Sequence, residues 1–352
     1  MEKRPIFIIG TERSGTNLLR VILNAHSNIA IPHPPHIMEN FFKIEPFYSV
    51  LGESGFKAMI NDVVHMVELH PYSWPIQIDR ERIFIESKCR DLINIFFCIY
   101  EQYLEYTGKK RWGCKSTFMI NHVALIRHYY PKAQFIYMVR DGRDVAVSAQ
   151  KSIFNNNSIY YIARRWQREQ SLGIYWLNQL SRKEIYLLKY EDLIDSPVET
   201  VDKICFFLGE AFEDKMFDFF KDKDVQKGAA LSVSWKNMAR PIIKGNYGKY
   251  KYELTNRDIE LFEALTWKEM DYFSYKLSKP VYFLESFGRW KEKPGFYDVF
   301  QEITGLLKNQ FLAFFTDRNN FLRYKKRIFL KLLRFYWIVK WILSGRKTVN
   351  IG

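Results

Sequence analysis

The chain has 352 residues, enough to bury a large hydrophobic core as one large domain or as two modest ones. Its four cysteines show no C-x-x-C spacing, which argues against a zinc ribbon and against a dense disulfide framework. The formal net charge of +14 is concentrated at the C-terminal end, so it does not by itself indicate nucleic-acid binding.

The first predicted element is a short buried strand over residues 5–9, followed by a glycine-containing loop and a helix over residues 17–25. Gly10 and Gly15 keep the G-x-x-x-x-G spacing of a P-loop, in which backbone N–H groups hold phosphate. The N-terminus of the helix also favours an anion. The segment therefore predicts a phosphate site, although a strand, a glycine turn and a helix also form the ordinary start of an α/β domain.

The loop lacks the two residues that a P-loop uses for metal-assisted phosphoryl transfer. Thr16 stands in place of the lysine, and Asn17 stands in place of the Ser/Thr whose hydroxyl binds Mg²⁺. Arg13, inside the loop, restores a cation. We therefore expect this loop to bind phosphate without a bound metal ion.

A second candidate anion site follows residues 134–139, an uncharged run rich in aromatic and branched side chains that predicts a central parallel strand. Ligands of open α/β sheets lie beyond the carboxyl ends of the strands, so Arg140 is expected to point into a crevice. The helix that follows would place Ser148 on a face that reaches the same anion. The alternative is that Arg140 pairs with Asp141 or Asp144.

Several other segments have helical patterns. Residues 56–70 and 90–105 are examples within a region, about residues 40–110, that is poor in strand patterns. Residues 160–180 are dense in aromatic side chains and arginine, and predict a long helix beside the crevice. A capping box at residues 196–199, with proline at the first helical position, predicts a helix that runs to about Leu208.

Five motifs occur in a fixed order at residues 10–16, 112–116, 139–148, 189–193 and 244–250. Together they resemble the sulfotransferases that use 3′-phosphoadenosine 5′-phosphosulfate (PAPS) as donor. In that family the first motif binds the 5′-phosphosulfate, the third binds the 3′-phosphate and the fourth lies near the adenine. The pattern is closest to bacterial and tyrosylprotein-like members, whereas the fifth motif, with Tyr250 in place of a tryptophan, resembles cytosolic members.

The resemblance implies a P-loop-like three-layer α/β fold, with a central parallel sheet flanked by helices, over residues 1–280. The helical patterns themselves predict that residues 40–110 form a helical insertion that covers the acceptor site, and that residues 281–352 form a basic, aromatic helical extension. The implied activity is metal-independent, in-line transfer of a sulfuryl group from PAPS to a hydroxyl of a glycan, a lipid or a small molecule. The implied donor-binding residues are Arg13, Ser14, Gly15, Thr16, Asn17, Arg140, Ser148, Tyr190, Lys244 and Gly245.

The chemistry of sulfuryl transfer agrees with the loss of the metal-binding hydroxyl at Asn17. A sulfuryl group carries less negative charge than a terminal phosphoryl group, so a divalent metal is less necessary. Hydrogen-bond donors are still needed where charge builds on the departing 5′-phosphate. Arg13, Lys115 and the backbone of residues 14–17 are the candidates.

The general base remains open between three residues. In tyrosylprotein-like and many bacterial members a glutamate follows the first helix, but Pro34 stands about where it would fall. An imidazole, with a pKa of about 6.5, suits proton abstraction near neutral pH. We favour His36 as the base, with His33 second and Glu39 third. The alternative is a proline-rich turn whose histidines only bond to the backbone.

The C-terminal residues 318–352 contain ten Lys/Arg and no Asp or Glu. Basic residues recur at helical spacing opposite apolar and aromatic ones, and the longest uncharged stretch, 335–339, is far too short to span a bilayer. This pattern is typical of a helix that lies on an anionic membrane surface, here through residues 318–347. The alternatives are a helix docked on the domain and a dimer contact; the oligomeric state is left open.

The N-terminal residues enter the first strand directly, and this feature, with the cysteine pattern, predicts a cytoplasmic enzyme, peripheral at the inner membrane face if the C-terminal helix binds lipid. Two other functions compete with sulfuryl transfer. A metal-dependent nucleotide kinase shares the strand-loop-helix start, but Thr16 and Asn17 argue against it. A non-catalytic PAPS-binding, membrane-associated protein would account for the missing glutamate.

Overall fold

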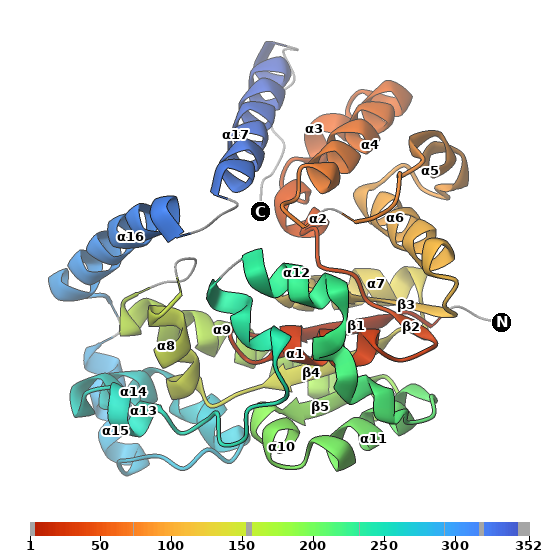
Figure 1. The fold of residues 1–352 in the computed structure, drawn as a ribbon. Coiled ribbons are helices and arrows are strands. Elements are labelled where there is room, and N and C mark those ends of the chain that lie inside the picture. The colour runs from red at the N-terminus through yellow and green to blue at the C-terminus, as the bar shows by residue number, and fades with distance from the viewer. Residues whose placement is uncertain are drawn as a thin grey trace.

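A computed structural model describes residues 4–72, 74–152, 157–231, 233–291, 293–316 and 320–343. At its centre lies a parallel sheet in the strand order β2-β3-β1-β4-β5, with helices on both faces (Figure 1). The strands are β1 (Ile6–Gly10), β2 (Ile29–Ala30), β3 (Arg111–Lys115), β4 (Gln134–Val139) and β5 (Ile185–Lys189). This architecture confirms the predicted three-layer α/β fold, and the strands expected at residues 5–9 and 134–139 are β1 and β4.

Alternation along β1 divides the core into two layers. Phe7 and Ile9 belong to the hydrophobic cluster on one face of the sheet, whereas Ile6 and Ile8 belong to the cluster on the other. The first face is covered by α6 (Leu92–Thr107), α7 (Val123–Tyr129), α9 (Ile159–Gln179) and α14 (Asn256–Tyr272). The second is covered by α1 (Thr16–Asn24), α10 (Tyr190–Asp195) and α11 (Pro197–Leu208). Both faces of the sheet are therefore buried, as is usual for parallel sheets.

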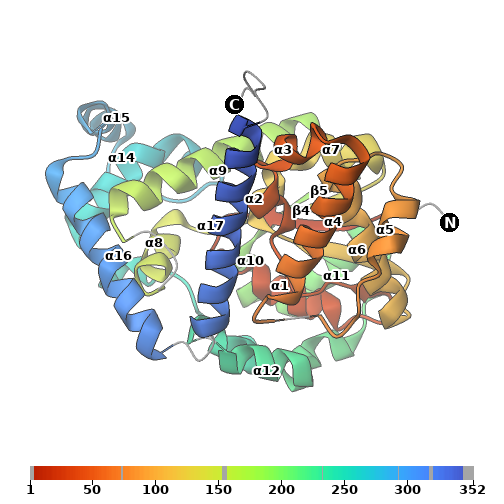
Figure 2. The ribbon, with the colours of Figure 1, turned by 90° about the horizontal axis from the view of Figure 1, so that it is seen from above.

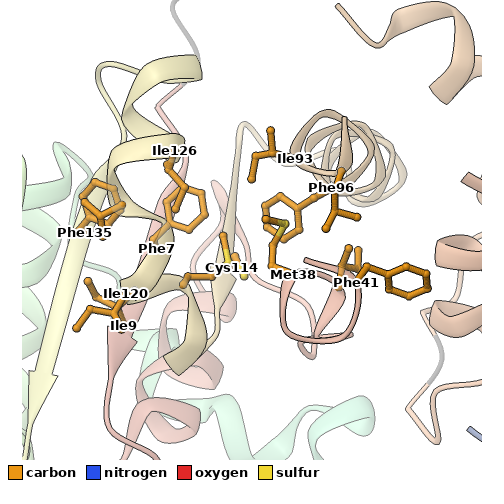
Figure 3. Packing of buried hydrophobic residues seen from close by; sticks show 14 of the residues in the cluster. Phe7, Ile9, Met38, Phe41, Ile93, Phe96, Cys114, Ile120, Ile126 and Phe135 are labelled. Carbon is orange, nitrogen blue, oxygen red and sulfur yellow. The ribbon is translucent and has the colours of Figure 1, made fainter. Parts of the chain in front are cut away.

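Figure 3 shows the first of these layers, with Phe7 and Phe135 on one side of Cys114 and Phe96 with Met38 on the other. The Phe7 and Phe135 rings stack with their centroids 5.6 Å apart. These residues come from β1, β3, β4 and two helices. Their packing therefore holds the three strands in place, and the candidate site lies at the ends of these strands.

The segment between β2 and β3 is helical in its described residues. It contains α2 (Ile37–Phe41), α3 (Glu45–Ser49), α4 (Gly52–Glu68), α5 (Arg80–Glu86) and α6. The helices expected at 56–70 and 90–105 are α4 and α6. In Figure 1 these helices lie together at one side of the sheet. The helices expected at 160–180 and from 196 to 208 are α9 and α11.

The rest of the chain adds short helices over the sheet edge and a group of longer helices at the C-terminal end. The elements are α8 (Gly142–Gln150), η1 (Thr117–His122), η2 (Asp214–Lys221), α12 (Lys223–Leu231), η3 (Val233–Ala239), α13 (Tyr250–Glu253), α15 (Val281–Trp290), α16 (Phe296–Thr316) and α17 (Asn320–Leu343). Among the described helices, none combines the length and the apolar character needed to span a bilayer.

Helix α17 docks on the helices that precede β3, as Figure 2 shows. Trp337 is buried, with its ring 4.1 Å from that of Tyr48 on α3, and Trp341 contacts Phe47 edge-on at 6.0 Å. The predicted basic helix is therefore present in the described part of the tail and is held by aromatic packing. Arg318, Arg346 and Lys347, which belong to the predicted basic segment, lie outside the described residues.

Candidate active site

A cavity of about 730 Å³ lies beyond the carboxyl ends of the strands. Its walls include Arg13 after β1, Lys115 at the end of β3, Arg140 after β4 and Tyr190 after β5. Parallel strands end at one edge of the sheet, so residues far apart in sequence meet there. The cavity therefore lies where the sequence predicted the two anion sites.

The loop at residues 10–16 has positive φ angles at several positions, a conformation that favours glycine. Gly10 has φ 141°, and a Cβ at this position would overlap the carbonyl oxygen of Met138. Gly15 has φ 88°, and a Cβ there would overlap the ring of Tyr190. Arg13 also has a positive φ, 69°. Gly10 thus lets the loop approach β4, and Gly15 lets it approach the Tyr190 ring.

Polar atoms of the loop are buried without a partner. Among the described residues, Ser14 Oγ and Asn17 Oδ1 have no hydrogen-bond partner, and neither does Nε of Arg140, whose Nη1 contacts the loop. Gly15, Thr16 and Asn17 line the cavity, whereas Ser14 is fully buried beside it. Buried polar groups in folded proteins are nearly always paired. Of these residues, Asn17 and Arg140 line the cavity and are therefore placed to bind a polar ligand.

The two predicted anion sites contact each other directly. Nε of Arg13 donates to Oγ of Ser148 at 3.0 Å, and Nη1 of Arg140 donates to the carbonyl oxygen of Arg13 at 3.0 Å. The guanidinium of Arg140 also lies 4.3 Å from the centre of the Tyr190 ring. Burial lowers the pKa of Arg13, and the positive charge of Arg140 adds to this effect although Glu12 opposes it. Cations packed this closely favour an anionic ligand.

The acidic residues beside Arg140 mainly bind other groups. Asp141 accepts hydrogen bonds from Arg143, whose Nη1 also lies 2.5 Å from Oε1 of the buried Glu263. Asp144 accepts from the backbone N–H groups of Gly248 and Tyr250, while its distance to Arg140 is 4.0 Å. Arg143 is thus the structural arginine of the motif, and Arg140 is the one that lines the cavity.

The segment 244–250 approaches the cavity through residues other than those that we expected. Lys244 is exposed, Gly245 has no atom within 4 Å of the place that a Cβ would take, and neither lines the cavity. Asn246 and Lys249 do line it. The carbonyl oxygen of Asn246 accepts from Arg140 at 3.1 Å, and its Nδ2 donates to the Tyr190 hydroxyl at 2.7 Å. Their place in the fifth motif was the signal that could have indicated them.

Lys115 lies in a buried position at the end of β3. Burial lowers the pKa of this lysine to about 8, although the negative charge of Glu12 partly opposes the change. Burial therefore makes the charged ammonium group unfavourable, and an anionic ligand would stabilise the charged form.

Two of the three candidate bases line the cavity, and the third, Glu39, contacts one of them. His36 has φ 63° and its Nδ1 lies 2.8 Å from Oε2 of Glu39. Burial raises the pKa of Glu39, but the hydrogen bond with His36 and the charge of Lys326 outweigh it, so the net shift is downward. His33 is buried beside the Tyr72 ring at 4.7 Å, and its pKa is well below the ordinary value because of burial and the neighbouring His70. His33 and His36 both line the cavity.

The C-terminal helices also contribute to the cavity, which the sequence did not indicate. Leu312 of α16 and Arg323 of α17 line it. Nζ of Lys326 donates to the carbonyl oxygen of Pro35 at 3.2 Å, next to His36, and burial lowers the pKa of this lysine to about 8. Residues of the C-terminal extension therefore form part of the cavity wall.

Comparison with known proteins identifies the class. A family model described as "Sulfotransferase family" matches residues 5–214, which is more than half of the chain. The chain therefore belongs to the sulfotransferase family.

Individual relatives match parts of the chain. Sulfotransferase 2A1 of Macaca fascicularis is 30% identical over 165 residues, covering 40% of this chain and 57% of the relative. Protein-tyrosine sulfotransferase 2 of Gallus gallus is 22% identical over 218 residues, covering 59% and 52%. An uncharacterized protein of Aquifex aeolicus is 24% identical over 271 residues, covering 72% of this chain and 31% of its own length. The chain thus spans between about a third and just over half of the length of these relatives.

Solved structures support the fold. The sulfotransferase domain of the Synechococcus PCC 7002 olefin synthase aligns with a TM-score of 0.54 at 18% identity, covering 78% of this chain and 97% of that domain. The sulfotransferase domain from the curacin biosynthetic pathway aligns with a TM-score of 0.54 at 19% identity, covering 78% and 99%. The shared architecture is the sheet with its flanking helices.

Proposed function

We propose that this protein transfers a sulfuryl group from PAPS to a hydroxyl group of an acceptor. The observation that carries the proposal is the contact between the two anion sites, where Arg13 donates to Ser148 and Arg140 donates to the backbone of Arg13. Two cationic sites that share one wall of a cavity suit a donor with a phosphosulfate at one end and a phosphate at the other. The family of the chain points to the same donor.

The cavity residues fit this donor. The unpartnered Nε of Arg140, a residue that lines the cavity, is a donor that a phosphate oxygen would satisfy. In our assignment the residues after β1, Arg13 to Asn17, bind the 5′ end, and Arg140 with Ser148 binds the 3′-phosphate. Tyr190 would contact the nucleoside, and Asn246 would support Arg140. Lys244 and Gly245 remain predictions, since neither lines the cavity.

In this proposal the chain stabilises negative charge on the leaving group. PAPS supplies the activated sulfuryl group. Arg13, Lys115 and the N–H groups at the start of α1 are held before the reaction begins, so they lower the barrier without reorganising. Lys115 would become fully charged beside the donor phosphate, because the phosphate raises the pKa that burial has lowered.

His36 is the base that the geometry favours. Its Nδ1 is held by Glu39 at 2.8 Å, which leaves Nε2 as the nitrogen that can accept a proton. A carboxylate in this position fixes the orientation of the ring and stabilises the imidazolium that forms. The low pKa of His33 makes it a weaker base, and Glu39 acts on the acceptor through His36 in this arrangement.

The proposal also divides the chain by role. Residues 1–280 would bind the donor and perform the transfer, and the helices within residues 40–110 would cover the acceptor end. The acceptor would be a hydroxyl-bearing glycan, lipid or metabolite. The kinase alternative loses support because the chain belongs to the sulfotransferase family.

The test uses the full chain and two measurements. Calorimetry with 3′,5′-diphosphoadenosine (PAP), the desulfated product, should show binding that survives EDTA. Radiolabelled PAPS incubated with a fractionated cell lysate should label an acceptor, again without Mg²⁺. Absence of PAP binding would overturn the proposal, and PAP binding without any labelled acceptor would favour the non-catalytic alternative.

A further inference from the structure

Helix α16 has the reverse of the usual arrangement of a surface helix. Its buried residues are polar: Glu302 accepts from the backbone N–H groups of Asn157 and Ser158 at 2.9 Å, and Asn309 donates to the carbonyl oxygen of Ser152 at 3.2 Å. Its exposed residues are aromatic and aliphatic. They include Phe296 (87% exposed), Phe300, Ile303, Leu307, Phe311 (67%), Phe314 (71%) and Phe315 (68%).

An ordinary amphipathic helix turns its apolar side to the core and its polar side to water. The outward side of α16 therefore lacks the apolar contact that its residues would gain by burial. Contiguous exposed apolar surface of this kind marks a binding surface in soluble domains.

Helix α17 presents a second exposed surface, of different character. Its docked side holds Leu330, Leu333 and Trp337 against the domain. Its exposed side mixes apolar and basic residues, and residues 320–343 include no Asp or Glu. The exposed residues are Phe321, Leu322, Tyr324, Lys325, Arg327, Ile328, Lys331, Leu332, Arg334, Phe335, Tyr336, Ile338, Lys340 and Ile342.

We propose that the exposed sides of α16 and α17, here called the C-terminal surface, bind an anionic lipid bilayer. The first argument is charge complementarity, since the exposed cations of α17 match anionic headgroups and the interleaved aromatic residues suit the interface. A second copy of the chain is a poorer occupant, because a two-fold contact through α17 would bring like charges together. Figures 1 and 2 show both helices on the same side of the molecule, outside the sheet.

The C-terminal surface borders the cavity, and this position identifies the class of acceptor. Leu312 of α16 and Arg323 of α17 both line the cavity wall and belong to the two helices that would touch the bilayer. A headgroup hydroxyl could therefore reach His36 while its acyl chains stay with the bilayer, and Arg323 would face the lipid phosphate. The inferred acceptor is a lipid with a hydroxylated, phosphate-bearing headgroup; this part of the inference rests on the proposed sulfuryl transfer.

The surface itself is tested by co-sedimentation of the full chain with vesicles. Wild type should bind vesicles of phosphatidylcholine mixed with phosphatidylglycerol, and bind phosphatidylcholine alone far more weakly. The variant Lys325→Glu/Arg327→Glu/Lys331→Glu should bind the anionic vesicles about a hundredfold more weakly, since each basic residue near the surface contributes about 1 kcal/mol. Phe311→Ser/Phe314→Ser should also weaken binding.

A matched control is Lys57→Glu, a charge reversal at an exposed lysine of α4. It should bind vesicles like wild type, and all variants should keep the wild-type melting temperature. Equal vesicle binding by wild type and the triple variant overturns the surface proposal. A dimer in sedimentation equilibrium that Phe311→Ser/Phe314→Ser converts to a monomer, with no vesicle binding by wild type, also overturns it and assigns the surface to a second copy.

The acceptor class is tested by the fate of the label. Radiolabelled PAPS with phosphatidylglycerol vesicles or extracted cell lipids should give labelled product in the organic phase. Label only in aqueous products overturns the lipid acceptor. PAP calorimetry on the same samples distinguishes failure of the proposed function from failure of the surface proposal. Vesicle binding without PAP binding counts against PAPS-dependent transfer. PAP binding without vesicle binding counts against lipid binding by the C-terminal surface.

Discussion

His36 and Glu39 form a hydrogen-bonded pair, with Nδ1 and Oε2 2.8 Å apart at the start of α2. The side chain of Asn40 donates to the carbonyl oxygen of His36 at 2.7 Å, so the left-handed backbone of His36 is supported locally. His36→Gln should lower turnover by about 10²- to 10⁴-fold, the usual contribution of a general base. PAP affinity, measured by calorimetry, should stay at the wild-type value.

The order of the effects distinguishes the candidate bases. Glu39→Gln should cost less than His36→Gln, because the imidazole can still accept a proton without its carboxylate partner. His33→Gln should affect turnover least. A turnover loss larger for Glu39→Gln than for His36→Gln would instead assign the base to Glu39.

Arg140 should control the preference for the 3′-phosphate. Arg140→Ala should weaken PAP binding about a hundredfold, the order expected when a buried charge partner is removed, and Arg140→Lys should restore only part of it because a lysine lacks the planar fork. Binding of adenosine 5′-phosphosulfate, which has no 3′-phosphate, should change little. Lys244→Ala is the comparison, and a loss as large as that of Arg140→Ala would place Lys244 at the donor despite its exposure.

Local signals in the sequence were enough to predict the strands and helices that border the cavity on the side of Arg13 and Arg140. The glycine spacing and the apolar run before Arg140 depend on neighbouring residues only, and β1, α1, β4 and α8 formed where those signals stood. The side of the cavity near Arg323 depends on long-range packing. Arg323 reaches the cavity because aromatic residues later in α17 pack on α3, and no pattern near residue 323 records that contact.

The pairing of His36 with Glu39 was not predicted, although the sequence contains a local signal for it. The two residues were weighed as alternatives, yet a spacing of three in a helix start places them together. The reversed side of α16 could not be predicted either. Its sequence has the composition of a buried helix, and only the structure shows that its polar residues bond inward.

Lys115 should produce a basic limb in the pH profile. Burial lowers its pKa to about 8, and the charged form is the one that neutralises the donor. The value of kcat/KM for the donor should therefore fall as the pH rises through about 8. Lys115→Arg should move this limb to higher pH, whereas Lys326→Gln, which removes the other lysine with a pKa of about 8, should leave it in place. A limb that persists unchanged in Lys115→Arg contradicts the assignment.

The same pKa shift should affect stability. The unfolded chain keeps Lys115 protonated up to about pH 10.5, and the folded chain loses that proton at about pH 8, so the unfolded state binds more protons between these values. The contribution of Lys115 is thus unfavourable below pH 8 and disappears as the pH rises through that window. Lys115→Met should raise the free energy of unfolding at pH 7 by about 3 kcal/mol while abolishing transfer. Urea unfolding at several pH values measures both effects, and a variant less stable than wild type at pH 7 would contradict the prediction.

Gly15→Ala should disturb the donor site through Tyr190. The added methyl group overlaps the Tyr190 ring, and φ 88° is unfavourable for alanine, so we expect a stability loss of about 1–3 kcal/mol and weaker PAP binding. Gly52→Ala is the matched control. Its φ is 58° and nothing lies within 4 Å of the new methyl group, so it should cost less stability and leave PAP binding unchanged. Melting curves and calorimetry of the two variants make the comparison.

The strand order has a consequence for synthesis of the chain. β1 is the central strand, and its partners are β3 and β4, which begin at residues 111 and 134. The apolar residues of β1 therefore leave the ribosome long before either partner exists, and wait for roughly 10 s at the usual rates of translation. During that time an unpaired strand is open to non-native association. We expect a chaperone to bind the first residues of the nascent chain and to prevent this association.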